Sequence, residues 1–481
     1  MKTIGNIDQD GEVRAIASGA LATGDTVIVN SDGTVSVVAG SDASAGTPVT
    51  FEASTASEIA ATFDSNSNKV VIAYGDEGNS NYGTAIVGTV SGSSISFGTP
   101  VVFVSQVADF ISATFDTAAG KVVIAYRDNR GSPDLDGVAI VGTVSGSSIS
   151  FGSPVIFEND RADHISICYD SDSQKVVVAY SDTNNSSYGT AIVGTVSGTS
   201  ISFGSATVFN NSGDTRFMSS AYDANAQKVV IAYRDNGNSG YGEAAVGTVS
   251  GTSISFGTPV VFLSRTMSVS AMAYDANAQK IVLAYRDAGN SNYPTCAVGT
   301  VSGTSISFGT PVVIDEVNVS FFGASYDSNS RSVVISYGIE NGLQGTAVVA
   351  TVSGTSITLD TPVIFESGET KWVSSAFDSN SNKVVISYQD KSNSEYGKAV
   401  VFSPASTNLT SEGFIGFANS GYADGQSAAI NSTCSVDNNQ SGLTAGETYY
   451  VQTDGTLGTT PADPSVLAGT AISSNSIIVK G

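Results

Sequence analysis

A tandem repeat of about 52 residues constrains the fold of this chain more than any other feature of its sequence. Segments of the type ATFDSNSNKVVIAY occur seven times, each with an aspartate that follows an aromatic residue and precedes a tyrosine by ten positions. The repeated aspartates are Asp64, Asp116, Asp170, Asp223, Asp275, Asp327 and Asp378. A period of this length suits four short strands and their turns. The sequence therefore predicts an all-β protein whose main part is a seven-bladed β-propeller.

Each repeat contains four expected strands, and no segment of it has helical periodicity. In the first repeat these strands cover residues 59–64, 69–74, 84–90 and 94–103. The middle of the first strand is small in most repeats, with pairs of Ala, Ser or Gly. Small side chains fit strands that crowd around a common axis, so a radial arrangement is favoured over a flat sandwich.

The seventh repeat lacks its fourth strand, and the missing piece lies at the other end of the chain. Its third strand is expected at 398–404 (KAVVFSP), after which the repeat pattern stops. A matching segment, TVSVVAGSDASAGTPVTF, precedes the first repeat at residues 34–51. We expect this segment to supply the outer strand of the last blade, which closes the ring and removes exposed sheet edges. The propeller is therefore expected to span residues 34–402.

The remaining segments, 1–33 and 403–481, are expected to form one small all-β module. Both contain a strand, a turn with Asp-Gly and a second strand: GDTVIVNSDGTVSVV near the start and GETYYVQTDGTLGTT near the end. We expect the N-terminal β segment to pack with the C-terminal β-rich part, for attachment or oligomerisation. The alternative is a simple cap on the propeller base.

The loops of the repeat differ in how much they vary within this single chain. The turns between first and second strands and between third and fourth strands are near copies. The segments before the first strands differ strongly, and the loops between second and third strands differ moderately, with the largest departure among these loops at residues 129–137. Because successive strands alternate in direction, the two variable loop types share one face, and the chain ends join the propeller at the opposite one. We expect any partner to bind the variable face.

Each variable segment before a first strand places one residue six positions before the repeated aspartate. These residues are Glu58, Phe110, His164, Phe217, Val269, Phe321 and Trp372. The five aromatic or imidazole members are candidate binding residues at the mouth of the channel: Phe110, His164, Phe217, Phe321 and Trp372. Such rings can stack on sugars or receive an apolar side chain. The alternative is that they plug the channel and pack on neighbouring blades.

Two further sets of residues lie in the loops between second and third strands. The tyrosines are Tyr82, Tyr188, Tyr241, Tyr293 and Tyr396, and the arginines are Arg127, Arg234 and Arg286. Binding is the functional interpretation of both sets. Packing is the simpler one for the tyrosines, and ion pairs with the adjacent Asp128, Asp235 and Asp287 are the simpler one for the arginines.

Composition and charge argue against several classes of function. A formal net charge of -24 disfavours nucleic acid and anionic membranes as direct partners. Three scattered cysteines and one histidine predict neither a disulfide framework nor a metal site. The repeated aspartates are expected to shape Asx turns, so we expect no catalytic residues, no metal and no cofactor. No segment has the character of a signal peptide or a membrane span.

Over about nine tenths of its length the chain resembles tail-fibre and related virion proteins of marine bacteriophages. The resemblance is carried by repeat units with KVVIAY, NSNYGTAIVGTV and SISFGTPVVF, by NLTSEGFIGFANSGYADGQSAAI at 408–430, and by the segment 441–481 that ends in IIVKG. It implies a virion component made in the host cytoplasm without a signal peptide. The propeller would bind a host-surface glycan or protein, and the terminal module would bind other virion or tail proteins.

Alternative functions stay open at this point. One is a purely structural virion component such as a collar, decoration or fibre spacer, and another is a bacterial propeller lectin, for which an export signal would be expected. A hydrolase is the weakest alternative because the carboxylates sit in near-identical turns. Neither nucleic-acid binding nor membrane insertion is expected, and homo-oligomerisation stays open.

Overall fold

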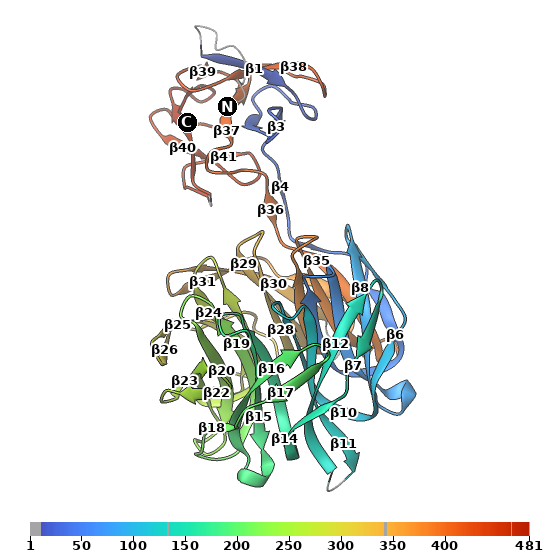
Figure 1. The fold of residues 1–481 in the computed structure, drawn as a ribbon. Coiled ribbons are helices and arrows are strands. Elements are labelled where there is room, and N and C mark those ends of the chain that lie inside the picture. The colour runs from blue at the N-terminus through green and yellow to red at the C-terminus, as the bar shows by residue number, and fades with distance from the viewer. Residues whose placement is uncertain (1–10, 132–133, 341–343, 463, 481) are drawn as a thin grey trace. The chain divides into compact units, whose positions relative to one another are not determined.

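The computed structural model describes residues 11–131, 134–340, 344–462 and 464–480. The chain divides into two compact units, one formed by Ser44–Pro404 and the other by the two terminal segments. Strands dominate both units (Figure 1), and the helices within the described ranges are two single-turn 3-10 helices, η1 (Glu77–Asn79) and η2 (Thr183–Asn185). Neither of these described helices has the length or apolar character needed to cross a membrane.

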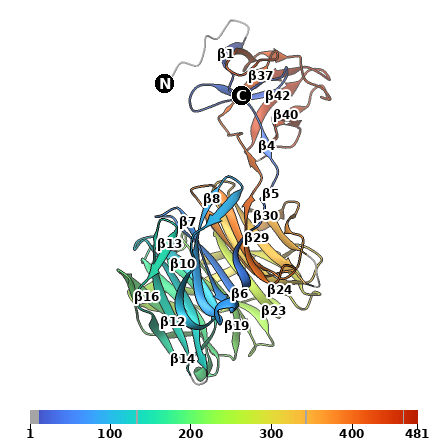
Figure 2. The same ribbon diagram turned by 90° about the vertical axis from the view of Figure 1, so that its right-hand side faces the viewer.

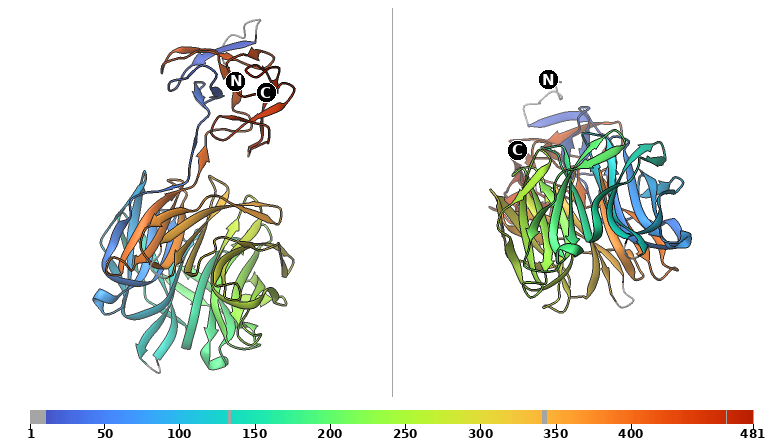
Figure 3. Two further views of the ribbon diagram at one scale, coloured as in Figure 1. Left: turned by 180° about the vertical axis from the view of Figure 1, so that it is seen from behind. Right: turned by 60° about the horizontal axis from the view of Figure 1, so that its bottom comes forward.

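The first strands of the seven repeats contact one another in cyclic order. They are β6 (Val49–Asp64), β10 (Val101–Asp116), β14 (Val155–Asp170), β19 (Thr215–Asp223), β23 (Val260–Asp275), β28 (Val319–Asp327) and β33 (Thr370–Asp378). Each contacts its predecessor and its successor, and β33 contacts β6, so the series returns to its start. Figure 3 accordingly shows the orange strands of the last repeat beside the blue strands of the first.

Each first strand is followed by an antiparallel meander. The second strands are β7 (Lys69–Asp76), β11 (Lys121–Gly131), β15 (Lys175–Asp182), β20 (Lys228–Asp235), β24 (Lys280–Asp287), β29 (Ser332–Ile339) and β34 (Lys383–Asp390). The third strands are β8 (Tyr82–Ser91), β12 (Asp134–Ser145), β16 (Tyr188–Ser197), β21 (Tyr241–Ser250), β25 (Tyr293–Ser302), β30 (Gly345–Ser353) and β35 (Tyr396–Ser403). Figure 2 shows β6, β7 and β8 of the first repeat side by side.

The fourth strand of the first six repeats is interrupted after four residues. Its first parts are β9 (Ser94–Phe97), β13 (Ser148–Phe151), β17 (Ser200–Phe203), β22 (Ser253–Phe256), β26 (Ser305–Phe308) and β31 (Ser356–Leu359). Its second parts are β18 (Thr207–Asn210), β27 (Val312–Val313) and β32 (Val363–Glu366), or else the beginnings of β10, β14 and β23. In the latter repeats one long strand therefore passes from the edge of one sheet into the first strand of the next.

The second strands form the centre of each sheet because their residues are apolar on both faces. In β7, Val70, Val71, Ile72 and Ala73 have no exposed surface, which matches the consecutive apolar residues of the run KVVIA. The tyrosine that follows is also fully buried in every repeat. In the first repeat the Tyr74 hydroxyl donates a hydrogen bond of 3.0 Å to a Glu52 carboxylate oxygen.

The repeated aspartate shapes the turn between the first two strands, as expected from the sequence. Asp64 Oδ1 accepts hydrogen bonds from the backbone N–H groups of Asn66 at 2.9 Å and Ser67 at 3.0 Å. The equivalent aspartates make the same kind of contact in the other repeats. The prediction of a structural Asx-turn role is therefore confirmed.

Small hydroxyl side chains join neighbouring first strands. The Ser166 and Ser220 hydroxyls lie 2.8 Å apart, and the Ser219 and Ser270 hydroxyls lie 3.0 Å apart. Between the last and the first repeat, the Ala61 N–H donates to the Ser374 hydroxyl at 3.0 Å. The small residues at the middle of these strands thus allow close approach and also supply hydrogen bonds between repeats.

The last repeat is completed by residues from before the first repeat. Strand β35 pairs with β5 (Ser44–Ala45) and then with the beginning of β6, where Lys398 is opposite Thr50 and Ala399 is opposite Val49. This matches the first repeat, in which β8 pairs with β9 and with the beginning of β10. The chain thus enters and leaves Ser44–Pro404 at the end of the sheets where the third strands finish.

The boundary of this completing segment differs from the expected residue 34. Strand β3 (Val35–Val37) pairs with β2 (Thr26–Val29), and residues up to Ala43 belong to the terminal unit. Besides the pairing of Val35–Val37 with β2, Gly40–Ser41 pair with Ser406–Thr407, so β35 pairs only from Ser44 onward. The C-terminal segment likewise separates after Pro404 rather than after residue 402.

The terminal unit consists of two small sheets and one short pairing. One sheet has the order β1-β38-β37-β2-β3 and the other the order β39-β43-β42-β40-β41, while β4 pairs with β36. The new strands are β1 (Glu12–Ile16), β4 (Gly40–Ser41), β36 (Ser406–Thr407), β37 (Phe414–Ala418), β38 (Ser427–Asn431), β39 (Val436–Asp437), β40 (Thr448–Val451), β41 (Leu457–Gly458), β42 (Val466–Ala471) and β43 (Ile477–Val479). N-terminal strands thus pair with C-terminal ones.

Candidate binding site

The residues six positions before the repeated aspartates occupy irregular points in the first strands. In the first repeat the register with β7 shifts between Ser57 and Ala60, so Glu58 lies outside the regular ladder. Similar shifts occur in the other first strands. A β-bulge of this kind redirects a side chain and is common next to functional sites.

Six of these seven residues have a left-handed backbone. Their φ angles are 52° at Glu58, 50° at Phe110, 53° at His164, 51° at Phe217, 35° at Val269 and 50° at Trp372. This region is unfavourable for bulky or β-branched residues and costs on the order of 1–3 kcal/mol per residue. The pairing on both sides of each bulge holds the chain in this conformation.

The bulged residues contact one another from repeat to repeat. The ring centroids of Phe110 and His164 are 4.9 Å apart, and those of His164 and Phe217 are 5.2 Å apart. On another part of the ring, Phe321 and Trp372 are 4.6 Å apart. The seven side chains are half-buried, so each keeps some exposed surface. We call Glu58, Phe110, His164, Phe217, Val269, Phe321 and Trp372 the bulge ring.

Two of the predicted arginines stack on the bulge ring. The Arg127 guanidinium carbon is 4.7 Å from the Phe110 ring centroid, and that of Arg234 is 5.7 Å from the Phe217 centroid. These distances are those of cation–π contacts. Arg127 also bonds to Asp109 and Asp163, while Arg286 contacts Glu340 at 3.5 Å.

The prediction that these arginines form ion pairs with the aspartates next to them is wrong. Asp128 pairs with Arg130 at 2.6 Å, Asp287 pairs with Arg265, and Asp235 accepts a hydrogen bond from Ser212. Successive residues of a strand point to opposite faces of the sheet, so an arginine and the next aspartate are held apart.

The five predicted tyrosines lie at the first residue of their third strands, opposite the aspartate that ends the second strand. Their positions therefore share one end of the sheets with the bulge ring but are farther along the meander. All five are half-buried. Binding through them stays a prediction.

Burial perturbs the two titratable members of the ring. Burial lowers the pKa of His164 to about 4, with nearby Asp163 acting in the opposite direction and nearby Arg216 in the same direction. Burial and the neighbouring Asp109 raise the pKa of Glu58 to about 7, although the Phe110 N–H group donates to it at 3.0 Å. Near neutral pH the imidazole is therefore uncharged, and the carboxyl is close to half-protonated.

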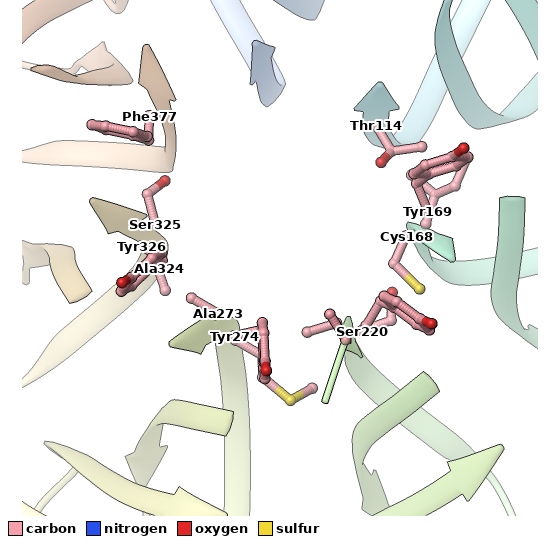
Figure 4. Close-up of a pocket in the computed structure, with 15 residues that line it drawn as sticks. Thr114, Cys168, Tyr169, Ser220, Ala273, Tyr274, Ala324, Ser325, Tyr326 and Phe377 are labelled. Atoms are coloured by element: carbon pink, nitrogen blue, oxygen red, sulfur yellow. The ribbon is translucent and has the colours of Figure 1, made fainter. Parts of the chain in front are cut away.

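Sequence reasoning missed a cavity at the opposite end of the first strands. Figure 4 shows its labelled residues arranged around an open centre, and its volume is about 460 Å³. It is lined by residues mostly one to three positions before the repeated aspartates, among them Cys168, Tyr169, Tyr274, Tyr326 and Phe377. At about 3.3 Å per residue, this lies roughly 15 Å along the strand from the bulge ring.

The tyrosines at this cavity bind the neighbouring repeat. The Tyr169 hydroxyl accepts from the Ala118 N–H at 3.2 Å, and the Tyr274 hydroxyl accepts from the Asn225 N–H at 3.1 Å. Burial raises the pKa of Cys168 to about 12, so its thiol stays protonated at neutral pH. An aromatic residue directly before each aspartate was the sequence signal that could have indicated this cavity.

A second set missed from the sequence lies seven positions before the repeated aspartates, directly next to the bulge ring. Asp109, Asp163 and Arg216 occupy this position and contribute to the charges around Phe110, His164 and Phe217. The signal was available as a column of polar residues in the repeat. That this column of residues pairs with the end of the second strand could be seen only in the structure.

The combined arrangement offers aromatic faces and stacked guanidinium groups. Aromatic faces bind the C–H surfaces of sugars or apolar side chains, and guanidinium groups bind carboxylates and other oxyanions. Within the described residues, no group of three or more His, Cys, Asp or Glu side chains has a geometry suited to a metal ion.

Comparison with known proteins gives a likeness of fold. No protein-family model and no curated protein matches the chain. It is similar to the crystal structure of BP39L lectin from Burkholderia pseudomallei, with a TM-score of 0.53 and 12% identity, over 75% of this chain and 99% of the lectin. It is also similar to a protein from Lactobacillus plantarum, with a TM-score of 0.47 and 12% identity, over 64% of this chain and 86% of that one. At such identity, the likeness to BP39L shows a propeller-like, all-β repeat fold.

Proposed function

We propose that Ser44–Pro404 is a seven-bladed β-propeller closed by its own first residues, and that it acts as an adhesin. The cyclic contacts of the seven first strands and the pairing of β35 with β5 and β6 support the blade count and the closure. The adhesin binds a glycan or protein of a cell surface through the bulge ring and the loops around it.

The observation that carries this proposal is the set of aromatic side chains at left-handed bulges. Phe110, Phe217 and Trp372 each have a φ near 50°, an unfavourable geometry that bulky residues seldom adopt. Backbone strain of this kind concentrates where a site must be held in a fixed arrangement. The aromatic groups are also half-exposed, on the side of the propeller where the repeats vary.

We further propose that this adhesin belongs to a bacteriophage virion, as a tail-fibre protein. The support is the resemblance of the repeats and of residues 408–430 and 441–481 to such proteins. In this proposal the terminal unit attaches the chain to other virion proteins, and the protein binds its target without catalysing a reaction.

Binding of the purified full-length chain to a glycan array and to candidate host cells tests the adhesin. We expect Trp372→Ala to weaken binding by about 2 kcal/mol, because a stacked aromatic contact is typical of binding hot spots. Tyr326→Phe, at the other end of the first strands, is the matched control and is expected to bind as the unmodified chain does. No binding to any surface would refute the proposal, and equal binding by Trp372→Ala would exclude Trp372 from the binding surface.

A lectin that acts outside any virion is the second candidate, and the likeness of fold to BP39L lectin favours it. Mass spectrometry and antibody labelling of purified particles separate the two. The tail-fibre proposal predicts the chain at an accessible site on the particle. Absence of the chain from particles would favour the lectin. Antibody labelling only after disruption of the particles would favour an internal structural component.

A further inference from the structure

The fourth repeat places two arginines opposite each other next to the bulge ring. Arg216 of β19 and Arg234 of β20 are direct partners across the two strands. At the equivalent place in the second repeat, Asp109 faces Arg127. Opposite charges at such positions stabilise a sheet, whereas like charges directly opposite each other destabilise it. The arginine pair is therefore an unfavourable choice for folding alone.

The nearby groups offset only one of these two charges. Asp214 accepts a hydrogen bond of 2.6 Å from Arg216 Nε and one of 2.8 Å from Asn236 Nδ2. Arg234 Nε donates to the neutral Asn236 Oδ1 at 2.6 Å. Two cations thus share one carboxylate, and a positive charge is left over at the half-buried Arg234.

The other arginines of this position provide an internal comparison. Arg127 bonds to two carboxylates, from Asp109 and Asp163, and Arg286 has a contact with Glu340. In the described part of the chain, Arg234 makes no ion pair of this kind. Burial and the adjacent Arg216 lower its pKa. Removing a charge from water is costly unless the charge is paired, so a bound anion would stabilise Arg234.

The surroundings of this pair add an apolar surface. The Arg234 guanidinium stacks on Phe217, whose ring contacts the uncharged imidazole of His164 at 5.2 Å. Arg216 directly precedes Phe217 in β19. Two planar guanidinium groups can hold an oxyanion by paired hydrogen bonds, while the adjacent rings can hold the C–H face of a sugar.

We propose that Arg216 and Arg234 bind the carboxylate or sulfate ester of an acidic saccharide whose ring packs on Phe217 and His164. This inference rests on the proposed function, because it names the ligand class of the same surface. The strong net negative charge of the chain favours a localised cationic site over general attraction of acidic polymers.

Calorimetric titration of the full chain with a sulfated oligosaccharide, a uronic-acid oligosaccharide and their neutral counterparts tests the inference. Arg216→Ser and Arg234→Ser suit this test because Ser268 and Ser181 occupy the same repeat positions in other repeats. Each is expected to weaken binding of the acidic ligand about tenfold or more, as loss of charged hydrogen bonds does. Arg161→Ser, which removes an exposed cation of the preceding repeat, is the matched control and is expected to change binding less than about threefold.

Thermal unfolding of the same variants separates binding from structure. Arg234→Ser removes an uncompensated charge, so it is expected to keep or raise the melting temperature while it weakens binding. An unchanged affinity in both variants, or equal affinity for acidic and neutral saccharides, would overturn the inference.

Failure of this inference is distinguishable from failure of the adhesin. Binding of neutral glycans alone, sensitive to Trp372→Ala, would leave the adhesin standing and refute the anion site. Saturable binding of inorganic sulfate that Arg234→Ser abolishes, without binding of any saccharide, would keep the anion site and refute its saccharide ligand; the adhesin is refuted only if the chain also binds no candidate host cell.

Discussion

At the scale of single residues, Glu58 differs from the rest of the bulge ring because it carries a carboxyl group among aromatic and apolar side chains. Its pKa is raised from 4.5 to about 7, first by burial and then by Asp109. Between these two pH values the folded protein keeps a proton that the unfolded chain has released. Folding stability from this group is therefore fully present below pH 4.5 and is lost as the pH rises through about 7.

We predict that Glu58→Gln removes this pH dependence. A glutamine keeps the acceptor oxygen for the Phe110 N–H group but carries no charge. The urea midpoint of the variant should thus rise relative to that of the unmodified chain as the pH increases from 4.5 to 7. Glu77→Gln, at an exposed residue of η1, is the control without such a trend. A difference in urea midpoint between variant and unmodified chain that stays constant with pH would contradict the raised pKa of Glu58.

At the scale of elements, the packing of one repeat on the next depends on a glycine after the first part of the fourth strand. A Cβ atom added at Gly204 would lie 1.8 Å from the carbonyl oxygen of Thr252, in the turn between third and fourth strands of the following repeat. The sixth repeat has Asp360 at this position, with the same backbone hydrogen bond to its third strand. The seventh repeat has no such turn because β35 leads out of the unit, so a side chain fits there.

We predict opposite sensitivities at these two equivalent positions. Gly204→Ala should destabilise the protein by about 1–3 kcal/mol, because backbone atoms of Thr252 would have to move. Asp360→Ala, at an exposed residue, should change stability by less than about 0.5 kcal/mol. Urea unfolding of both variants checks this. Equal changes in stability would show that the turn around Thr252 can move at little cost in free energy.

The strands and turns were largely predictable because their residues act locally. The alternation between KVVIAY runs and Asp-containing turns indicated the meander, and the displaced SAGTPVTF segment indicated which strand completes the last repeat. The left-handed bulges were not predictable, since a register shift such as that around Phe217 is set by pairing with β20. The same holds for the opposition of Arg216 and Arg234. It also holds for the boundary at Ser44, which depends on the pairing of Gly40–Ser41 with Ser406–Thr407.

At the scale of the whole molecule, closure of the Ser44–Pro404 unit depends on few residues. Strand β35 holds the beginning of the unit through the pairs Ser403 with Ser44 and Phe402 with Ala45, and through the start of β6. Every other neighbouring pair of repeats is joined by a continuous chain. The junction between the last and the first repeat is therefore the place where an unfolding transition is expected to begin.

A disulfide across this junction tests whether opening there limits stability. We predict that Ser44→Cys with Ser403→Cys, in a Cys434→Ser background that removes the exposed thiol, raises the free energy of unfolding by up to about 5 kcal/mol, because the bond closes a loop of about 360 residues. Ser302→Cys with Ser305→Cys joins direct partners across a short turn and should add only about 2 kcal/mol. Calorimetric melting of oxidised and reduced forms measures both gains. If the closure disulfide forms and raises stability no more than the hairpin disulfide does, the two ends of the unit are not the weak point, and unfolding begins within a repeat.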